Sequence, residues 1–371
     1  MPLNTIPNKG LTSRGYPSDR LVTPIIINGD MSVAQRGTSA TGKTADGYYT
    51  TDRWNHSINL GTWSITQATD IPTGQGFAKS HKMTCTTGGS TSAGTQTYFH
   101  TRLEGQNLQM LKKGTSNAES LTLSFWGKSA TTTGTMTVEL FDTDNSRQIS
   151  KQISLTTSWT KYTINYDADT TGTLNNDNGA SLYVIFWVSA GSNFTSGTLS
   201  ETWTSNTNAN RAVGQTNFAV TNTELYFTGV QLEVGEFDST SIPSFPFESF
   251  DNNLRKCQRY YHQIGYGLNG AGGTVNAGQG QWYNSSEVTL TVYFPTSMRA
   301  TPSMTSPTVS SGYRFHSAGS FVDASDGGSI NSPSNMMTGI FKNGLSGGSG
   351  GQASFLAMIA SGASYKFDAE L

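Results

Sequence analysis

The sequence predicts an all-β protein that consists of a β-sandwich, a short helix and a smaller, glycine-rich β unit. Apolar and polar residues alternate with a period of two over many short segments, as in strands that bury one face. The 371 residues include 41 glycines, which suits tight turns between such strands. Apolar residues recur at helical spacing around residues 249–262, where we expect the helix.

The overall composition excludes several functions. Charged residues make up 13% of the chain and the formal net charge is −2, so no basic surface for nucleic acid is expected. No apolar run is long enough to cross a membrane. The first ten residues lack the apolar core of a signal peptide. Cys85 and Cys257 are predicted to be buried free thiols, and a single disulfide between them is the alternative.

Residues 1–24 are rich in proline and show no periodic apolar pattern, which indicates an extended arm without a core of its own. Such an arm is either a loose terminus or an anchor that becomes ordered on another protein. The residues that would make the anchor contacts are Pro7, Leu11, Tyr16 and Leu21.

Residues 25–248 are predicted to form the sandwich. Alternation is clear in segments 121–125, 136–140 and 162–166. Segment 182–188 is apolar at every position, so we expect a central strand that is covered on both faces. Turn-rich gaps without helical patterns separate the strands, which favours a sandwich or jelly roll over alternating strands and helices.

Segment 224–261 links the two β units. Its strand changes phase at Gly229, where we expect a bulge. Pro243 and Pro246 then exclude a central strand. The helix 249–262 follows, and we expect its apolar face to pack against the sandwich or against other subunits through Phe250, Leu254, Cys257 and Tyr261.

Residues 263–371 are predicted to form the second β unit, with strands at 287–294, 313–322, 353–359 and 365–370. The unit has few aliphatic residues, so neighbouring copies would help it to bury enough apolar surface. Aromatic residues near short polar side chains suit sugar binding, because sugar C–H faces pack on aromatic rings. The candidates are Trp203, in the long polar segment 189–216, and Trp282, Tyr283 and Tyr313. The alternative for each is a core or intersubunit contact.

No catalytic, metal or cofactor site is expected. The five histidines lack metal-site spacing, and neither a nucleophile elbow nor a phosphate-binding loop occurs. Asp142, Asp144 and Asn145 loosely match a calcium loop, but the glycine and the closing glutamate are missing, so we expect a turn. Four carboxylates could in principle form a glycosidase pair, although their separation cannot be tested from sequence: Glu139, Asp142, Glu201 and Glu233.

Six short motifs, in this order, resemble a recurrent module of tail-fibre and appendage proteins of tailed bacteriophages. They are NGDMSVAQRG (28–37), YTTDRW (49–54), LSFWGKS (123–129), TGVQLEVG (228–235), CQRYY (257–261) and FDAEL (367–371). The resemblance covers residues 25–371. It implies a virion protein, often a homotrimer, whose first domain resembles carbohydrate-binding jelly rolls.

The resemblance therefore implies a tail-fibre or capsid-fibre subunit that recognises host-surface polysaccharide during adsorption. It would be made in the host cytoplasm and lie at the virion surface, attached to other virion proteins by residues 1–24 and facing the host with residues 263–371. One alternative is a structural decoration or adaptor protein that binds no glycan. A less favoured alternative is a polysaccharide depolymerase.

Overall fold

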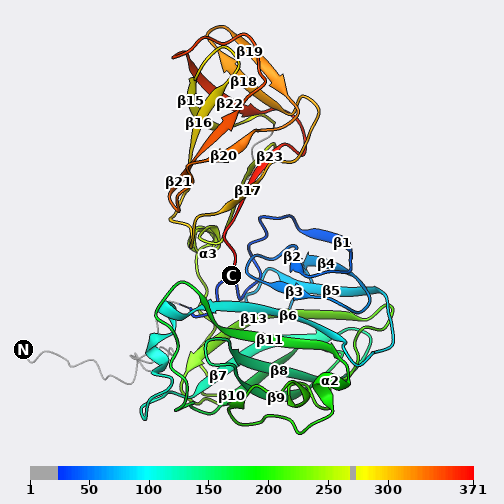
Figure 1. The fold of residues 1–371 in the computed structure, drawn as a ribbon. Helices are drawn as coiled ribbons and strands as arrows, with labels where there is room; N and C mark the ends of the chain where they lie inside the picture. The colour runs from blue at the N-terminus through cyan, green and yellow to red at the C-terminus, as the bar shows by residue number, and fades with distance from the viewer. Residues whose placement is uncertain (1–23, 268–272) are drawn as a thin grey trace, which may run out of the picture. The chain divides into compact units, whose positions relative to one another are not determined.

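The computed structural model describes residues 24–267 and 273–371, and it shows the all-β architecture that the sequence predicts (Figure 1). The expected anchor residues Pro7, Leu11, Tyr16 and Leu21 lie outside the described residues. The chain divides into two compact units, Met1–Phe250 and Asp251–Leu371. In the described part of the chain, no helix is long and apolar enough to cross a membrane.

The first unit is a sandwich of two antiparallel sheets, a jelly-roll architecture. The six-stranded sheet has the order β1 (Ser39–Lys43), β4 (Thr62–Ala68), β5 (Ser80–Thr87), β13 (Glu224–Val234), β7 (Leu121–Ser129) and β10 (Thr160–Tyr166). The seven-stranded sheet has the order β12 (Thr204–Ser205), β9 (Arg147–Leu155), β8 (Gly134–Asp142), β11 (Ala180–Ala190), β6 (Gln96–Glu104), β3 (Asn55–Ser57) and β2 (Gly47–Tyr48). Short helical turns lie at η1 (Gly105–Asn107), η2 (Gln109–Leu111), α2 (Ser192–Thr195) and η3 (Asn208–Asn210).

Aromatic side chains from both sheets form the centre of the sandwich core. Phe99 and Phe186 stack with ring centroids 4.7 Å apart, and Phe125 meets Phe186 edge-on at 5.0 Å. Phe227, from the opposite sheet, lies 4.6 Å from Phe99. Burying one such side chain contributes roughly 1.5–3 kcal/mol, so this cluster is a main source of the unit's stability.

Strand β11 is covered on both faces, which confirms the prediction from its continuous apolar run. Leu182, Val184 and Phe186 face the main core. Ile185 and Trp187 face a second cluster, in which Phe194 and Ala212 of the long segment 189–216 cover the outer side of the sheet. The segment that sequence analysis identified as a long polar loop therefore acts in part as a lid over the sheet.

The bulge predicted at Gly229 is present in β13. The pairing of β13 with β7 shifts register between Thr228 and Gln231. Gly229 has φ +64°, and a Cβ atom there would lie 2.5 Å from the ring of Phe77. A side chain is therefore excluded both by backbone conformation and by space.

The linking helix differs from the prediction at its end. Helix α3 spans Phe250–Gln258, and Tyr261 begins β14 (Tyr261–Gly265) instead of ending the helix. Strand β14 pairs with β23 (Ser364–Asp368), and the ladder that begins at Tyr261 replaces continuation of the helix. Cys257 and Tyr261 are buried, Leu254 is half-buried and Phe250 is exposed. Both cysteines are free and buried, as predicted.

The second unit contains two further antiparallel sheets. The smaller has the order β14, β23 and β17 (Ser303–Thr305). The larger has the order β19 (Ser320–Ala324), β18 (Tyr313–Ser317), β22 (Ala353–Met358), β15 (Val275–Trp282), β16 (Val288–Tyr293), β21 (Met337–Lys342) and β20 (Ser329–Asn331). The expected single strand at 313–322 is a hairpin, because the chain turns at Gly319 with φ +76°.

Candidate functional site

A groove of about 620 Å³ lies on the seven-stranded sheet of the second unit. Strands β15, β18, β19 and β22 and the β18–β19 turn form it. Its lining combines three aromatic rings with neutral polar side chains and small residues. The lining residues that matter for the chemistry are Asn276, Gln279, His316, Ser320, Phe321 and Phe355.

Strand alternation places the aromatic rings on the outer face of this sheet. In β18 the side chains of Tyr313 and Phe315 are fully buried, so the intervening side chains of the strand point outward. His316 pairs with Phe321 across the β18–β19 hairpin, and Phe355 of β22 pairs with Gln279 of β15. Side chains opposite each other in antiparallel strands share a face, so these residues form a row across the sheet.

The rings of the row are close together and accessible. His316 and Phe355 stack with centroids 3.9 Å apart and planes 12° apart. Phe321 lies 6.1 Å from His316. Phe321 is 49% exposed and Phe355 is 36% exposed, so both present apolar surface to solvent. Grouped exposed aromatic rings in a hollow indicate a contact surface for a ligand or partner.

A surface ion pair borders the aromatic row. The Arg314 guanidinium lies 3.6 Å from the centre of the Phe321 ring and donates to both carboxylate oxygens of Asp323, at 2.7 and 2.9 Å. Partial burial, and then the positive charge of Arg314, lower the pKa of His316. His316 is therefore neutral at neutral pH and can both donate and accept a hydrogen bond.

The carboxyl groups that a hydrolase uses as acid and base do not line this groove. None of the described residues that line it is an aspartate or glutamate. The nearest carboxylate discussed above, that of Asp323, is already paired with Arg314. The chemistry that the groove offers is ring stacking together with neutral hydrogen bonding.

Burial corrects the predictions for two of the sugar-binding candidates. Trp282 is fully buried beneath a glycine-rich loop, and a Cβ atom at Gly348 would lie 2.0 Å from the indole ring. Tyr313 is also fully buried, and its hydroxyl donates to the carbonyl of Pro307 at 2.8 Å. Neither ring has a face that a ligand could reach. Tyr283 is 70% exposed, but it lies outside the groove lining.

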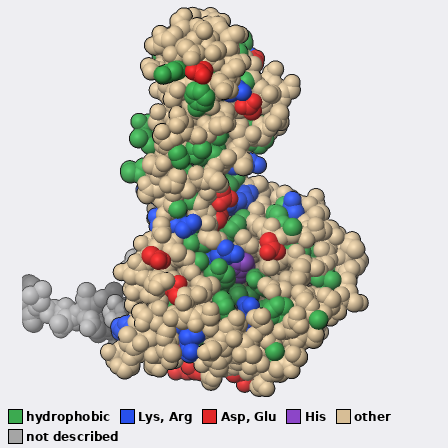
Figure 2. All heavy atoms as spheres, in the orientation of Figure 1, with side chains coloured by type: hydrophobic (Ala, Val, Ile, Leu, Met, Phe, Trp, Pro, Cys, Tyr) green, Lys and Arg blue, Asp and Glu red, His purple; other side chains and the backbone are tan. Residues whose placement is uncertain are grey.

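Exposed large apolar side chains gather on the second unit. Figure 2 shows hydrophobic side chains on its surface. The largest are Tyr283 after β15, Phe321 and Phe355 at the groove, and three residues at the β16–β21 pair: Tyr293, Met336 and Met337. Sequence analysis missed a signal in strand 353–358. Apolar residues occupy both faces of this strand, so some of them must lie on the outer face of the sheet.

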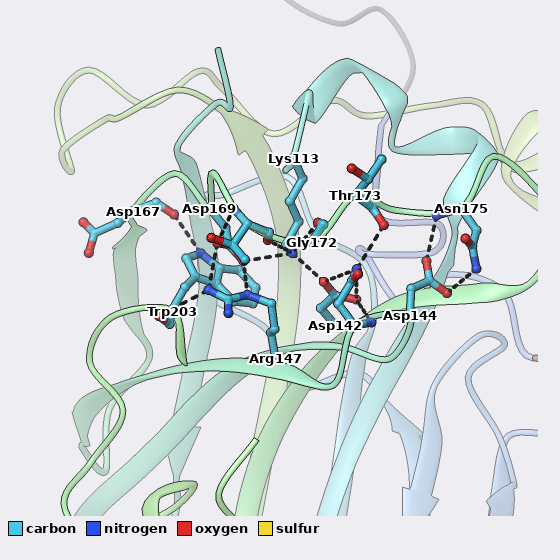
Figure 3. Close-up of polar contacts among 12 residues, drawn as sticks. Lys113, Asp142, Asp144, Arg147, Asp167, Asp169, Gly172, Thr173, Asn175 and Trp203 are labelled. Carbon is cyan, nitrogen blue, oxygen red and sulfur yellow. Dashed lines mark hydrogen bonds and ion pairs between the residues drawn. The ribbon is translucent and has the colours of Figure 1, made fainter. Parts of the chain in front are cut away.

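Trp203, the remaining candidate, is held in an ionic network of the sandwich (Figure 3). Its indole N–H donates to the carbonyl of Asp167 at 2.8 Å, and the Lys113 ammonium lies 5.0 Å from the ring centre. Lys113 pairs with Asp142, and with Asp169 at 2.9 Å. Trp203 is thus half-buried, and its ring is held as part of this network (Figure 3).

Asp169 joins the network to β9. Arg147 donates to both of its carboxylate oxygens, at 2.7 and 2.9 Å. Burial alone would raise the pKa of Asp169, but hydrogen bonds from Arg147 and Lys113 outweigh it and hold the pKa below the ordinary value. Asp169 therefore remains charged, and its carboxylate is paired with Arg147 and Lys113.

Two of the four carboxylates considered for an acid–base pair, Glu139 and Asp142, are engaged in structural contacts. Glu139 is fully buried and accepts hydrogen bonds from Trp187 at 2.8 Å and from Arg211 at 2.8 and 3.1 Å. Asp142 accepts from the backbone N–H of Asn145 at 3.0 Å, which confirms the predicted turn. Among the described residues, no group of three or more potential ligands could hold a metal ion.

Comparisons with known proteins give fold likeness only. No family model matches the chain, and no curated protein matches it. Among solved structures, the CBM22-1–CBM22-2 tandem domain of Paenibacillus barcinonensis Xyn10C is 10% identical, covering 96% of this chain and 98% of that one, with a TM-score of 0.30. A CBM4 structure is 13% identical, covering 56% and 97%, with a TM-score of 0.30.

A bacteriophage protein also occurs among these structures. The enzymatically active domain of tailspike protein 4 from bacteriophage CBA120 is 11% identical, with a TM-score of 0.30. The match covers 57% of this chain and only 21% of the tailspike chain. Similarity at this level assigns no family and no activity to this chain.

Proposed function

We propose that the chain is a subunit of a bacteriophage virion appendage, and that the groove of its second unit binds host-surface polysaccharide. The observation that carries the binding proposal is the row formed by Phe321, His316 and Phe355, with Gln279 beside it. The virion assignment is supported by the order of the six sequence motifs. The location at the virion surface belongs to the same proposal.

The chemistry of the row suits a sugar chain. The C–H face of a sugar ring packs on exposed phenyl rings, here Phe321 and Phe355. Side-chain amides of Asn276 and Gln279 can bond the hydroxyl groups that remain at the edge of the sugar. A volume of about 620 Å³ lies within the range of ligand sites, roughly 300–1,000 Å³. The groove also lies on an outer sheet face, where a polymer can continue past the protein.

We further propose that the groove binds without cleaving. Hydrolysis of a glycosidic bond needs two carboxyl groups that flank it. The described groove lining contains none, and Glu139 and Asp142 of the sandwich are engaged in ion pairs. These contacts support a binding role over a depolymerase.

Self-association is part of the proposal, because repeated weak sites gain avidity when copies are joined. Tyr293 is 73% exposed and pairs across strands with Met337, which is 44% exposed. This apolar pair lies outside the groove lining and supports a contact between copies. The same pair favours the second candidate function, a structural decoration or adaptor protein that makes only protein contacts.

The test is a pair of variants with a matched control. We expect Phe321→Ala and Phe355→Ala each to weaken binding of purified host-surface polysaccharide about tenfold, measured by calorimetry, and to reduce adsorption to host cells. Tyr283→Ala removes an exposed ring that lies outside the groove lining, and it should leave polysaccharide binding unchanged. Tyr293→Ala tests the contact between copies, and molecular mass in solution is measured for all four variants.

Three outcomes would contradict the proposal in different ways. Normal binding by the folded Phe321→Ala and Phe355→Ala variants would show that the groove is not the site. Loss of oligomeric mass in Tyr293→Ala, with no polysaccharide binding by the unaltered protein, would favour the structural role. Release of reducing ends from the polysaccharide would establish an enzyme.

A further inference from the structure

A second, smaller pocket of about 250 Å³ lies on the outer face of the six-stranded sheet of the sandwich. Strands β7, β10 and β13 form its floor, and segments 74–77 and 244–247 form its walls. The lining combines Trp126, Phe245 and Phe247 with Lys161 and Gln231. It is separate in the chain from the groove proposed to bind polysaccharide and does not depend on it.

Buried oxygen atoms without hydrogen-bond partners lie at the floor of this pocket. They are Ser124 Oγ and Gln231 Oε1, on side chains that are 1% and 4% exposed. Gln231 Nε2 is engaged, since it donates to the carbonyl of Pro243 at 2.9 Å. A buried polar atom without a partner costs about 1–3 kcal/mol, so their presence in one pocket requires an explanation.

A third such atom belongs to the same row. Gln231 pairs with Ser124 across β13 and β7, and Ser124 pairs with Thr163 across β7 and β10. Thr163 Oγ1 is also buried without a partner. Because residues opposite each other share a face, the three oxygens lie side by side across three neighbouring strands. They can bond a group of adjacent hydroxyls, with Gln231 Oε1 as acceptor.

Lys161 adds a charge to the pocket. It pairs with Trp126 across β10 and β7, and burial lowers the pKa of its ammonium group. No carboxylate forms an ion pair with Lys161 within the described residues, whereas Lys82, Lys113 and Lys128 of the same unit all have one. A half-buried ammonium group without a counter-ion favours an anionic ligand.

Phe247 is the exposed part of the wall. It is 53% exposed and belongs to a segment without regular secondary structure. It packs on Phe77 and Phe245 with centroid distances of 5.1 and 5.0 Å. The oxygens of the floor have no contact with solvent, so a ligand reaches them when the Phe247 ring moves aside.

We propose that this pocket binds a single acidic sugar residue, with its hydroxyls on Ser124 and Gln231 and its carboxylate on Lys161. Trp126 and Phe245 supply the apolar walls for the ring of the sugar. The volume is below that of ordinary sites for larger ligands, about 300–1,000 Å³, which fits one sugar residue and not a chain.

The test uses the full chain and D-glucuronate as the probe, with D-glucose as the uncharged analogue, in titration calorimetry. We expect glucuronate to bind at least about tenfold more tightly than glucose, because only glucuronate offers a carboxylate to Lys161. Lys161→Gln should remove that preference. Lys151→Gln, on β9 of the other sheet, is the charge-matched control and should retain it.

Ser124→Ala separates a ligand role from a structural one. Ser124 Oγ has no partner in the folded chain, so its removal should leave thermal stability unchanged or slightly higher while it weakens glucuronate binding. Any of three results would overturn the proposal: no glucuronate binding by the unaltered protein, equal binding of glucose and glucuronate, or full binding by both Ser124→Ala and Lys161→Gln.

Discussion

Each unit of the molecule contains an arginine that donates two hydrogen bonds to one carboxylate, and the surroundings of these two pairs are opposite. Arg211 and Glu139 of the sandwich are buried between a sheet and the segment that covers it. Arg314 and Asp323 of the second unit lie at the surface beside the groove. The same chemical pair therefore fixes internal structure in one unit and borders a binding surface in the other.

Aromatic residues differ between the units in the same way. Phe99, Phe186 and Phe227 stack within the sandwich, and none of them is exposed. Phe321 and Phe355 each lie beside His316 on the outside of a sheet. The three sandwich rings therefore contribute to stability, while Phe321 and Phe355 of the second unit remain available for contacts.

The largest effect is expected from neutralising the buried carboxylate. Glu139→Gln leaves the Arg211 charge buried without a counter-charge and should destabilise the sandwich by about 3–5 kcal/mol. Asp323→Asn, the matched change at the surface pair, should leave the unfolding midpoint unchanged within error because water solvates both groups. Urea unfolding of both variants measures this contrast. Equal losses would mean that burial does not distinguish the two pairs.

Acid should weaken the sandwich more than the second unit. His56 and His81 are fully buried with their Nε2 atoms 3.0 Å apart, and His100 is buried nearby in the same unit. Burial lowers the pKa of His56 to about 4, and it lowers the pKa of His81 and His100 well below the ordinary value. In the second unit, burial lowers the pKa of His262 to about 4.

The direction in which stability changes with pH follows from proton binding. Between pH 6.5 and about 4 the unfolded chain holds protons that the folded chain does not, so stability is complete above pH 6.5 and falls as pH falls. Each buried histidine contributes a slope of up to about 1.4 kcal/mol per pH unit. Calorimetry at pH 7 and pH 5 should show the larger shift in the sandwich transition, and His56→Phe should reduce that shift. Equal shifts of both transitions would contradict the assignment.

A smaller effect is expected at helix α3. Leu254 is only half-buried within one chain, so Leu254→Ala should cost about 1 kcal/mol, below the 2–5 kcal/mol of a fully buried leucine such as Leu232. A cost in the higher range that depends on protein concentration would show that copies of the chain pack on this helix. Thermal unfolding at two concentrations, with Leu232→Ala as the reference, distinguishes these outcomes.

Much of the fold could be predicted because its signals are local. The alternation of residues 136–140, the two-sided apolar run 182–188 and the phase change at Gly229 each require only neighbouring residues to interpret. The groove could not be predicted, because Phe321 and Phe355 come to lie beside His316 only through the pairing of β18 with β19 and β22. Register between distant strands is not contained in the pattern of either strand alone.

The same limitation explains the error at Trp282. Its own strand places the side chain on the inner face, and the loop that covers it arrives from residues 344–351. The glycines of that loop lack side chains, which lets the backbone lie against the indole ring. The contact between this loop and Trp282 joins segments that are distant in the sequence, so no local pattern predicts it.

The bulge at Gly229 has a consequence for how this surface can change during evolution. Residues 225 and 227 face the core before the bulge, and residues 230 and 232 face it afterwards, so Gln231 and Glu233 are directed outward. Deleting one codon at this position would exchange the interior and exterior residues of the rest of the strand while leaving its first part in place. Gln231 and Glu233 would then face the core. A deletion at Gly229 would therefore disrupt both the sugar pocket and the packing of β13, so the two features are inherited together.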